Sequence, residues 1–263
     1  MRKTILIATT FAALSAPVIT TAALADDGDE EAYTSETVVY SQRRLVMAQG
    51  LIRPELSLFV ADFGDDTAVG FGVKVDWTPI DKLQVGAVAS PRLSPSTYAG
   101  DPMLYARYQL LEGAAQVAVQ AGYTFTDPGP GVIHLGVPLR FGINPASRID
   151  ITPLFIIDLP SDGEDTAFGL SVPISLGVSL TRAIYLDLTT GIDIPDFDFD
   201  LASIPLGLEV GYSLKSEEDA FIDLFLSVSF ADFVRPSAPE GTDAASLDFW
   251  KIAIGGRGHF GLE

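Results

Sequence analysis

The strongest constraint on the fold of this chain is a two-residue alternation along the sequence. Over residues 167–180 every second residue is large and apolar, and the residues between are mainly Gly, Ser or Pro. Successive side chains of a β-strand point to opposite faces, so this pattern predicts strands with one apolar face. Twelve stretches of this kind lie at 51–61, 67–77, 82–90, 103–111, 114–125, 132–143, 148–158, 167–180, 183–194, 201–214, 220–231 and 247–260.

The lengths of the stretches and of their connections define the fold class. Most stretches have about ten residues, which is what a tilted strand needs to cross a bilayer. Connections after even-numbered stretches are short, as at 111–113 and 181–182, whereas several of the others are longer, as at 91–102 and 231–246. This combination predicts an all-β fold, a transmembrane antiparallel up-and-down β-barrel of about 12 strands with both chain ends at the short-turn rim.

The first 25 residues have a different pattern. Arg2 and Lys3 precede an apolar run over 5–14, and Ala23 and Ala25 form a small-x-small cleavage site. This is the pattern of a secretory signal peptide. The mature chain is therefore expected to work outside the cytoplasm, and because the sequence has no Cys it does so without disulfides.

Over residues 50–263 the chain resembles Gram-negative outer-membrane β-barrel proteins of the porin kind. The resemblance rests on the signal peptide, the two-residue alternation and the aromatic residues near the strand ends. The aromatic residues concerned are Trp77, Tyr108, Tyr123, Tyr212, Trp250 and Phe260. Such barrels usually finish on an aromatic residue, whereas here three further residues follow Phe260. The resemblance implies that the protein lies in the cell outer membrane, in contact with lipid and lipopolysaccharide, and that its permeants are small polar solutes or ions. It also implies that the protein is not an enzyme and binds no cofactor.

A secreted β-sandwich or a lipocalin-like barrel would also alternate, with its apolar face turned inward. The face opposite the apolar one is mainly Gly, Ser, Thr, Gln and Ala, and Lys is scarce. A solvated surface usually carries more Lys and Glu. The composition therefore favours a narrow polar lumen inside a membrane barrel.

If the apolar face meets lipid, the alternation points the charged strand residues into the lumen. Basic residues then occupy one half of the wall and acidic residues the other, apart from Glu55 and Asp76. The basic residues are Arg53, Lys74, Arg107, Arg140, Lys251 and Arg257, and the acidic ones are Asp150, Asp158, Asp187, Asp193, Glu209 and Asp223. Two interpretations follow, which can coexist: a transverse field that orients polar permeants, and an ion-paired layer that narrows or shuts the barrel.

The formal net charge of −19 disfavours a nucleic-acid partner, because the chain offers no basic surface for phosphates. The acidity is concentrated in the longer connections, which hold fifteen Asp and Glu against only Arg92 and Arg235. We expect this rim to attract cations, either as permeants or as divalent ions that bridge to lipid phosphates. Asp196, Asp198 and Asp200 are a minor Ca²⁺ candidate beside the simpler interpretation of a solvated loop, since the EF-hand spacing is absent.

Catalysis has little support in the sequence. Outer-membrane lipases need a Ser–His pair at the lipid-facing rim. The sequence has two His residues, and the alternation points both His134 and His259 inward, at opposite ends of the barrel.

Residues 26–49 form an N-terminal arm at the periplasmic rim. The arm either is mobile or lies in the lumen, with Arg43 and Arg44 against the acidic wall. The function we expect is porin-like passive passage of small hydrophilic solutes or ions. The alternative is a closed structural or surface-binding barrel that acts through its acidic loops.

Overall fold

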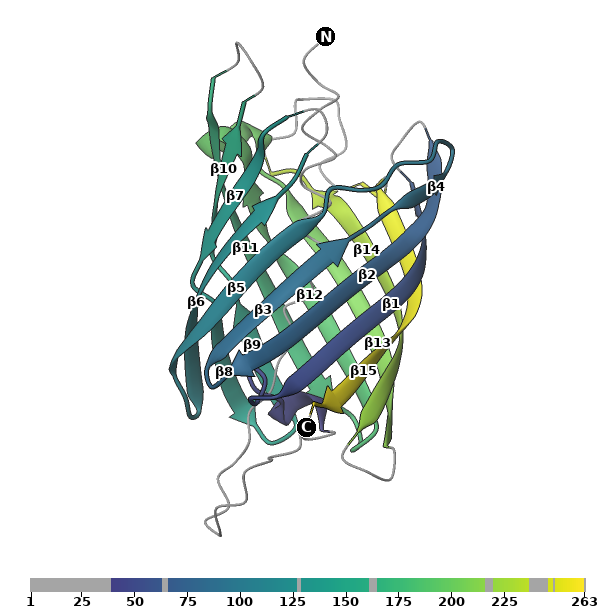
Figure 1. The fold of residues 1–263 in the computed structure, drawn as a ribbon. Helices are drawn as coiled ribbons and strands as arrows, with labels where there is room; N and C mark the ends of the chain where they lie inside the picture. The colour runs from purple at the N-terminus through teal and green to yellow at the C-terminus, as the bar shows by residue number, and fades with distance from the viewer. Residues whose placement is uncertain are drawn as a thin grey trace.

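The chain forms a closed β-barrel with tilted antiparallel strands (Figure 1). The computed structural model describes residues 39–62, 66–126, 129–160, 165–215, 220–236, 246–247 and 249–262. The predicted signal peptide and residues 26–38 of the predicted arm lie outside this part of the chain. The strands are β1 (Leu51–Asp62), β2 (Thr67–Ile80), β3 (Leu83–Ala89), β4 (Arg92–Ser94), β5 (Met103–Leu111), β6 (Ala115–Thr124), β7 (Gly131–Gly136), β8 (Leu139–Asn144), β9 (Ser147–Ile151), β10 (Leu154–Leu159), β11 (Ala167–Ser179), β12 (Ile184–Ile194), β13 (Ile204–Lys215), β14 (Phe221–Val234) and β15 (Trp250–Gly261).

These segments make twelve barrel strands, as predicted. β7 and β8 are successive halves of one barrel strand, β9 and β10 are halves of the next, and β4 pairs only with β2. The two breaks coincide with Pro138 and Pro153, because proline has no N–H to donate to a strand ladder. The barrel closes where β1 pairs with β15, with Glu55 opposite Arg257.

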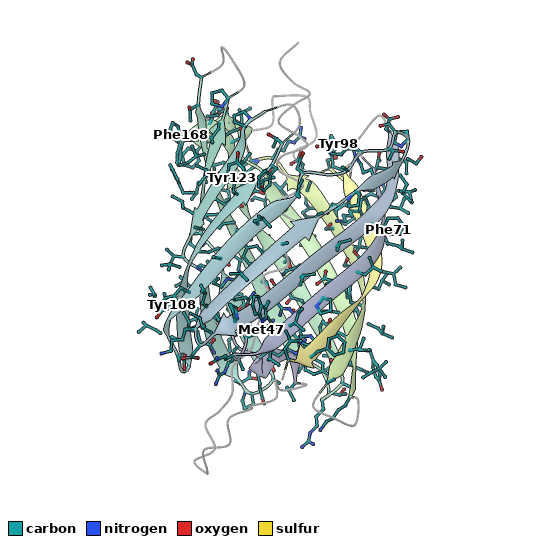
Figure 2. The ribbon with its side chains drawn as sticks, in the orientation of Figure 1. Met47, Phe71, Tyr98, Tyr108, Tyr123 and Phe168 are labelled. Atoms are coloured by element: carbon teal, nitrogen blue, oxygen red, sulfur yellow. The ribbon has the colours of Figure 1, made fainter. Side chains whose placement is uncertain are left out.

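The outer face of the barrel is apolar. Leu226 and Ile254, which face each other on β14 and β15, are 54% and 62% exposed. Tyr108 and Tyr123 also project from the wall (Figure 2). A soluble protein rarely exposes an apolar surface of this extent, whereas a membrane barrel presents it to lipid. The outer face thus agrees with a transmembrane barrel and not with the secreted alternative.

None of the helices formed by the described residues is long and apolar enough to cross a membrane.

The two rims differ as expected. Short turns join β5 to β6 and β8 to β9 at one end, called here the short-turn end, and the longer connections lie at the other, the long-loop end (Figure 1). The backbone N–H of Leu262 donates to the carbonyl of Gly50 at 2.8 Å. The beginning and the end of the barrel therefore meet at the short-turn end.

Glycines on the inner face make room for bulky lumen side chains. Tyr185 on β12 pairs with Gly211 on β13, and a Cβ on Gly211 would lie 2.0 Å from the Tyr185 ring. The absence of that Cβ allows the ring to lie flat along the wall, where it supports the site described next.

Candidate functional site

A layer of charged side chains crosses the lumen near the short-turn end. Arg53, Arg107 and Asp223 each lie within five residues of that end of their strands. Most of the layer is buried, and Glu55 and Glu209 are partly buried. The charged layer consists of Arg53, Glu55, Lys74, Asp76, Arg107, Arg140, Arg148, Asp150, Asp187, Glu209, Asp223 and Arg257.

One cluster of the charged layer is centred on Asp76. Arg53, directly opposite Asp76 on the neighbouring strand, lies 2.5 Å from its carboxylate, and the amine of Lys74 lies 3.4 Å away. The hydroxyl of Tyr105 donates to the same carboxylate. Two cations thus share one fully buried anion.

A second cluster is centred on Asp150. Arg140, its cross-strand partner, approaches the carboxylate to 2.5 Å, and Arg148 approaches it to 3.1 Å. Arg148 also lies 3.9 Å from Asp187 on β12. Sequence reasoning missed Arg148, although it shares the strand and the parity of Asp150.

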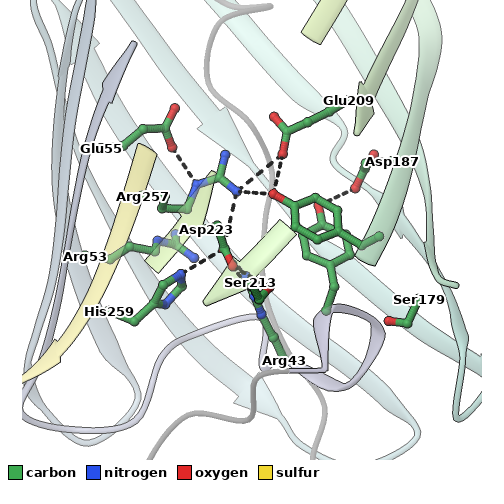
Figure 3. Close-up of polar contacts among 12 residues, drawn as sticks. Arg43, Arg53, Glu55, Ser179, Asp187, Glu209, Ser213, Asp223, Arg257 and His259 are labelled. Atoms are coloured by element: carbon green, nitrogen blue, oxygen red, sulfur yellow. Dashed lines mark hydrogen bonds and ion pairs between the residues drawn. The ribbon is translucent and has the colours of Figure 1, made fainter. Parts of the chain in front are cut away.

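A third cluster surrounds Arg257 (Figure 3). Its guanidinium lies 2.7 Å from Glu55, 3.4 Å from Glu209 and 3.9 Å from Asp223. The ring of His259 contacts Asp223 at 3.1 Å between Nε2 and Oδ2. One arginine on β15 therefore gathers carboxylates from three other strands.

One residue departs from the expected separation into a basic half and an acidic half, because Arg148 lies among the acidic residues. Asp76 and Glu55, the two expected exceptions, lie among the basic residues, and all three are paired. A buried charge without a partner is costly, so cations and carboxylates are placed side by side across strand pairs. The inward charges therefore form an ion-paired layer, which can coexist with a transverse field.

Residues 39–49, called here the inner segment, lie inside the short-turn end against this layer. Three arginines donate to its backbone carbonyls. Arg148 donates to Tyr40, Arg140 to Arg43 at 2.5 Å, and Arg107 to Leu45 at 3.2 Å. Each of these carbonyls is thereby satisfied by a wall side chain and not by a strand ladder.

Two glutamines of the wall accept hydrogen bonds from the inner segment. The Oε1 of Gln116 accepts from the backbone N–H of Leu45 at 2.7 Å, and that of Gln84 accepts from Met47 at 3.3 Å. Leu45 and Met47 are themselves buried. The inner segment is therefore held along its length.

Arg43 is the main side-chain anchor of the inner segment. Its guanidinium makes two hydrogen bonds to Asp223, at 2.5 and 2.7 Å, and one to Ser213 at 3.0 Å. Both charged side chains are fully buried. The ring of Phe221 lies 4.7 Å below the guanidinium, which adds a cation–π contact.

Tyr40 is the second anchor and lies in the short helix η1 (Tyr40–Gln42). Its ring stacks on Tyr185 with the centroids 3.9 Å apart, and its hydroxyl donates to Asp187 at 2.5 Å. Burial, reinforced by the charge of Asp187, raises the pKa of Tyr40 well above its ordinary value. The hydroxyl therefore stays protonated and remains a donor.

Residues 39–49 lie in the lumen, which is the second of the two interpretations of the arm. Arg43 lies against Asp223 of the acidic wall, as the alternative interpretation has it, while Arg44 is half-buried. The physical reason is that the charged layer leaves donors and acceptors pointing inward, and the inner segment satisfies them.

Above the charged layer, a cavity of about 160 Å³ extends toward the long-loop end; we call it the cup. Lys251 lines the cup with its amine 4.7 Å from the Phe59 ring centroid, and Asp193 lines it from β12. Asp158 lies half-buried near the long-loop end of β10. Where the cup meets the charged layer it is lined by Tyr40, Glu55, Lys74, Asp150, Asp187 and Glu209. The remaining polar lining comes from Ser57, Ser90, Ser171, Ser175, Thr189, Ser227 and Ser229.

The other predicted residues lie apart from these contacts. Asp196, Asp198 and Asp200 are exposed in η2 (Pro195–Phe197) and η3 (Phe199–Leu201), where Asp198 accepts from the backbone N–H of Asp200. Within the described ranges no three His, Cys, Asp or Glu side chains are placed to hold a metal ion. The carboxylate of Asp198 caps its own turn, in keeping with the simpler interpretation of a solvated loop, and the Ca²⁺ candidate stays a prediction.

The two histidines do face inward. His134 is buried on β7, where its Nε2 contacts the hydroxyl of Thr124 at 2.9 Å, and His259 is buried beside Asp223. These contacts are structural ones within the wall.

Comparison with known proteins shows the fold. No family model and no curated protein matches the chain. The NanC porin superposes with a TM-score of 0.61 at 10% identity, over 77% of this chain and 98% of that one. A bacterial polysaccharide outer membrane secretin gives a TM-score of 0.41 at 12% identity, over 82% of this chain and 100% of that one. An anion-selective porin from Comamonas acidovorans gives a TM-score of 0.36 at 9% identity, over 80% of this chain and 98% of that one. The chain has the porin-like fold of outer-membrane β-barrels.

Proposed function

We propose, with a porin-like barrel as the premise, that this protein passes small hydrophilic solutes or ions through its lumen and catalyses no reaction. The observation that carries the proposal is the cup. Its serines, its threonine and the side chains of Lys251 and Asp193 replace the hydration of a polar solute, as a permeation path requires. The apolar surface is on the outside, so the lumen is the polar route through the barrel.

The charge of the lumen and rim supports a preference among solutes. The carboxylates of Asp196, Asp198 and Asp200 are exposed at the long-loop end. Clustered charge of one sign raises the local concentration of counter-ions. We therefore propose that this rim lies at the outer side of the membrane, next to lipopolysaccharide phosphates, and concentrates cations. We also propose that residues 1–25 are the signal peptide that directs the chain to the outer membrane.

Planar-bilayer recording of the refolded full-length protein tests this function. Discrete conductance steps are expected, with a reversal potential under a salt gradient that indicates cation preference. Steps with anion preference would contradict the role of the rim. A folded protein that gives no steps in any variant would contradict passage itself.

A second candidate is a closed structural or surface-binding barrel. The inner segment and the ion-paired layer favour it, because together they occupy the short-turn end of the lumen. The two candidates differ in one measurable respect: loosening the inner segment raises conductance only if the lumen is a path.

A further inference from the structure

The contacts of the inner segment are those of a bound peptide. Its carbonyls and N–H groups are met by side chains from six separate strands, and its backbone joins no sheet. The donors are Arg107 on β5, Arg140 on β8 and Arg148 on β9, and the acceptors are Gln84 on β3, Gln116 on β6 and Ser179 on β11. Side chains that recognise main-chain groups accept any sequence, so selectivity must come from pockets.

Two such pockets exist. The first takes a guanidinium: Asp223 binds it through two hydrogen bonds, Ser213 adds a third, and Phe221 supplies an aromatic face. The second takes a phenol, which stacks on Tyr185 and donates to Asp187 (Figure 3). The inner segment fills them with Arg43 and Tyr40.

The vacated site would be polarised. Among the described residues no carboxylate lies within ion-pair distance of Arg107, whose guanidinium bonds to Gln120 and to the carbonyl of Leu45. Across the barrel, Asp223 would lose Arg43 and keep Ser213, His259 and Arg257. Departure of the inner segment thus leaves Arg107 on β5 without one acceptor and Asp223 on β14 without its bidentate cation.

We propose that this end of the lumen is a peptide-binding site, that Tyr40–Met47 is its built-in occupant, and that the channel opens when the occupant leaves. The ligand class is a short peptide that carries a guanidinium side chain. The binding part stands on the contacts alone, and the opening part rests on the proposed function.

A binding experiment tests the site without any conductance. The probe is a fluorescent peptide of residues 39–48, and the protein is the full chain with Tyr40→Ala and Arg43→Ala, checked for folding by heat-modifiable migration on a gel. We expect the peptide to bind this variant, to bind the unaltered chain at least tenfold more weakly, and to lose at least tenfold in affinity when the peptide itself carries Arg43→Ala. Equal binding to both proteins, equal binding of both peptides, or no binding would overturn the proposal.

A cross-link tests whether the inner segment must move. The hydroxyl oxygens of Ser41 and Ser179 are 2.9 Å apart, and the chain has no cysteine of its own. In the Ser41→Cys/Ser179→Cys variant, oxidation is expected to lower the open probability at least tenfold and a reductant to restore it, while Ser41→Cys alone responds to neither. Equal conductance in the oxidised and reduced states would overturn the opening step. Specific peptide binding with no conductance in the Tyr40→Ala/Arg43→Ala variant would refute the proposed function and leave the binding site standing.

Discussion

The substitution Asp223→Asn is expected to release the inner segment and leave the barrel folded. Asp223 accepts two hydrogen bonds from Arg43, and both side chains are fully buried. Removing one partner of a buried ion pair costs about 3–5 kcal/mol. Asparagine keeps one oxygen acceptor for Arg43, so we take the lower value of about 3 kcal/mol, which is about a hundredfold in the ratio of released to bound segment.

Trypsin measures that ratio, because it cuts after Arg43 and Arg44 only when the inner segment is out of the lumen. Where release and return are faster than cleavage, the rate follows the released population. We expect these two bonds to be cut about a hundredfold faster in Asp223→Asn than in the unaltered chain, with the new N-terminus identified by mass spectrometry.

The matched control is Asp76→Asn. Asp76 is equally buried, but its partners Arg53, Lys74 and Tyr105 all belong to the wall. This substitution is expected to lower the temperature of barrel unfolding while cleavage after Arg43 stays slow. Equal cleavage of Asp223→Asn and the unaltered chain would refute the view that Asp223 holds the inner segment.

Three further predictions concern the outer face, the inner glycines and the cup. Leu226→Arg places a charge on the lipid side of β14 and should lower the free energy of unfolding in vesicles by about 2–4 kcal/mol, measured by denaturant titration. The control Leu111→Arg, at the end of β5, should cost about 0–1 kcal/mol. Equal costs would contradict the lipid-facing assignment. Gly211→Ala should displace Tyr185, lower the free energy of unfolding by about 1–3 kcal/mol and speed tryptic cleavage after Arg43 and Arg44. In the control Gly207→Ala, on the same strand, the added Cβ would lie 3.5 Å or more from its neighbours, so the change should be nearly neutral. Lys251→Gln should shift the reversal potential under a salt gradient in the direction of greater cation selectivity, and Asp193→Asn in the direction of greater anion selectivity. An unchanged reversal potential in both variants would place the cup outside the permeation path.

Part of the charged layer could have been paired from the sequence. Arg53 with Asp76, and Arg140 with Asp150, are directly opposite each other in strands that follow one another along the chain. The same reasoning would have found Arg148, which has the parity of Asp150. The contacts of Arg257 with Glu209 could not be found in this way, because they join strands that are not neighbours in the barrel.

The inner segment shows the same limit more strongly. Arg43 and Asp223 are 180 positions apart, and no periodic pattern marks residues 39–49 as buried. A segment of this kind has no strand partner, so its position depends on which side chains the closed wall presents to it.

By itself the sequence determined the barrel. A period of two residues gives every strand a lipid face and a lumen face, so the strand number, the direction of the side chains and the short-turn end all follow from local pattern. Only the tertiary structure decided that the inward charges neutralise one another and that Arg43 completes them. The reason is physical: a lumen brings together groups from strands distant in sequence, and the cost of burying each charge depends on which partner the closed barrel places beside it.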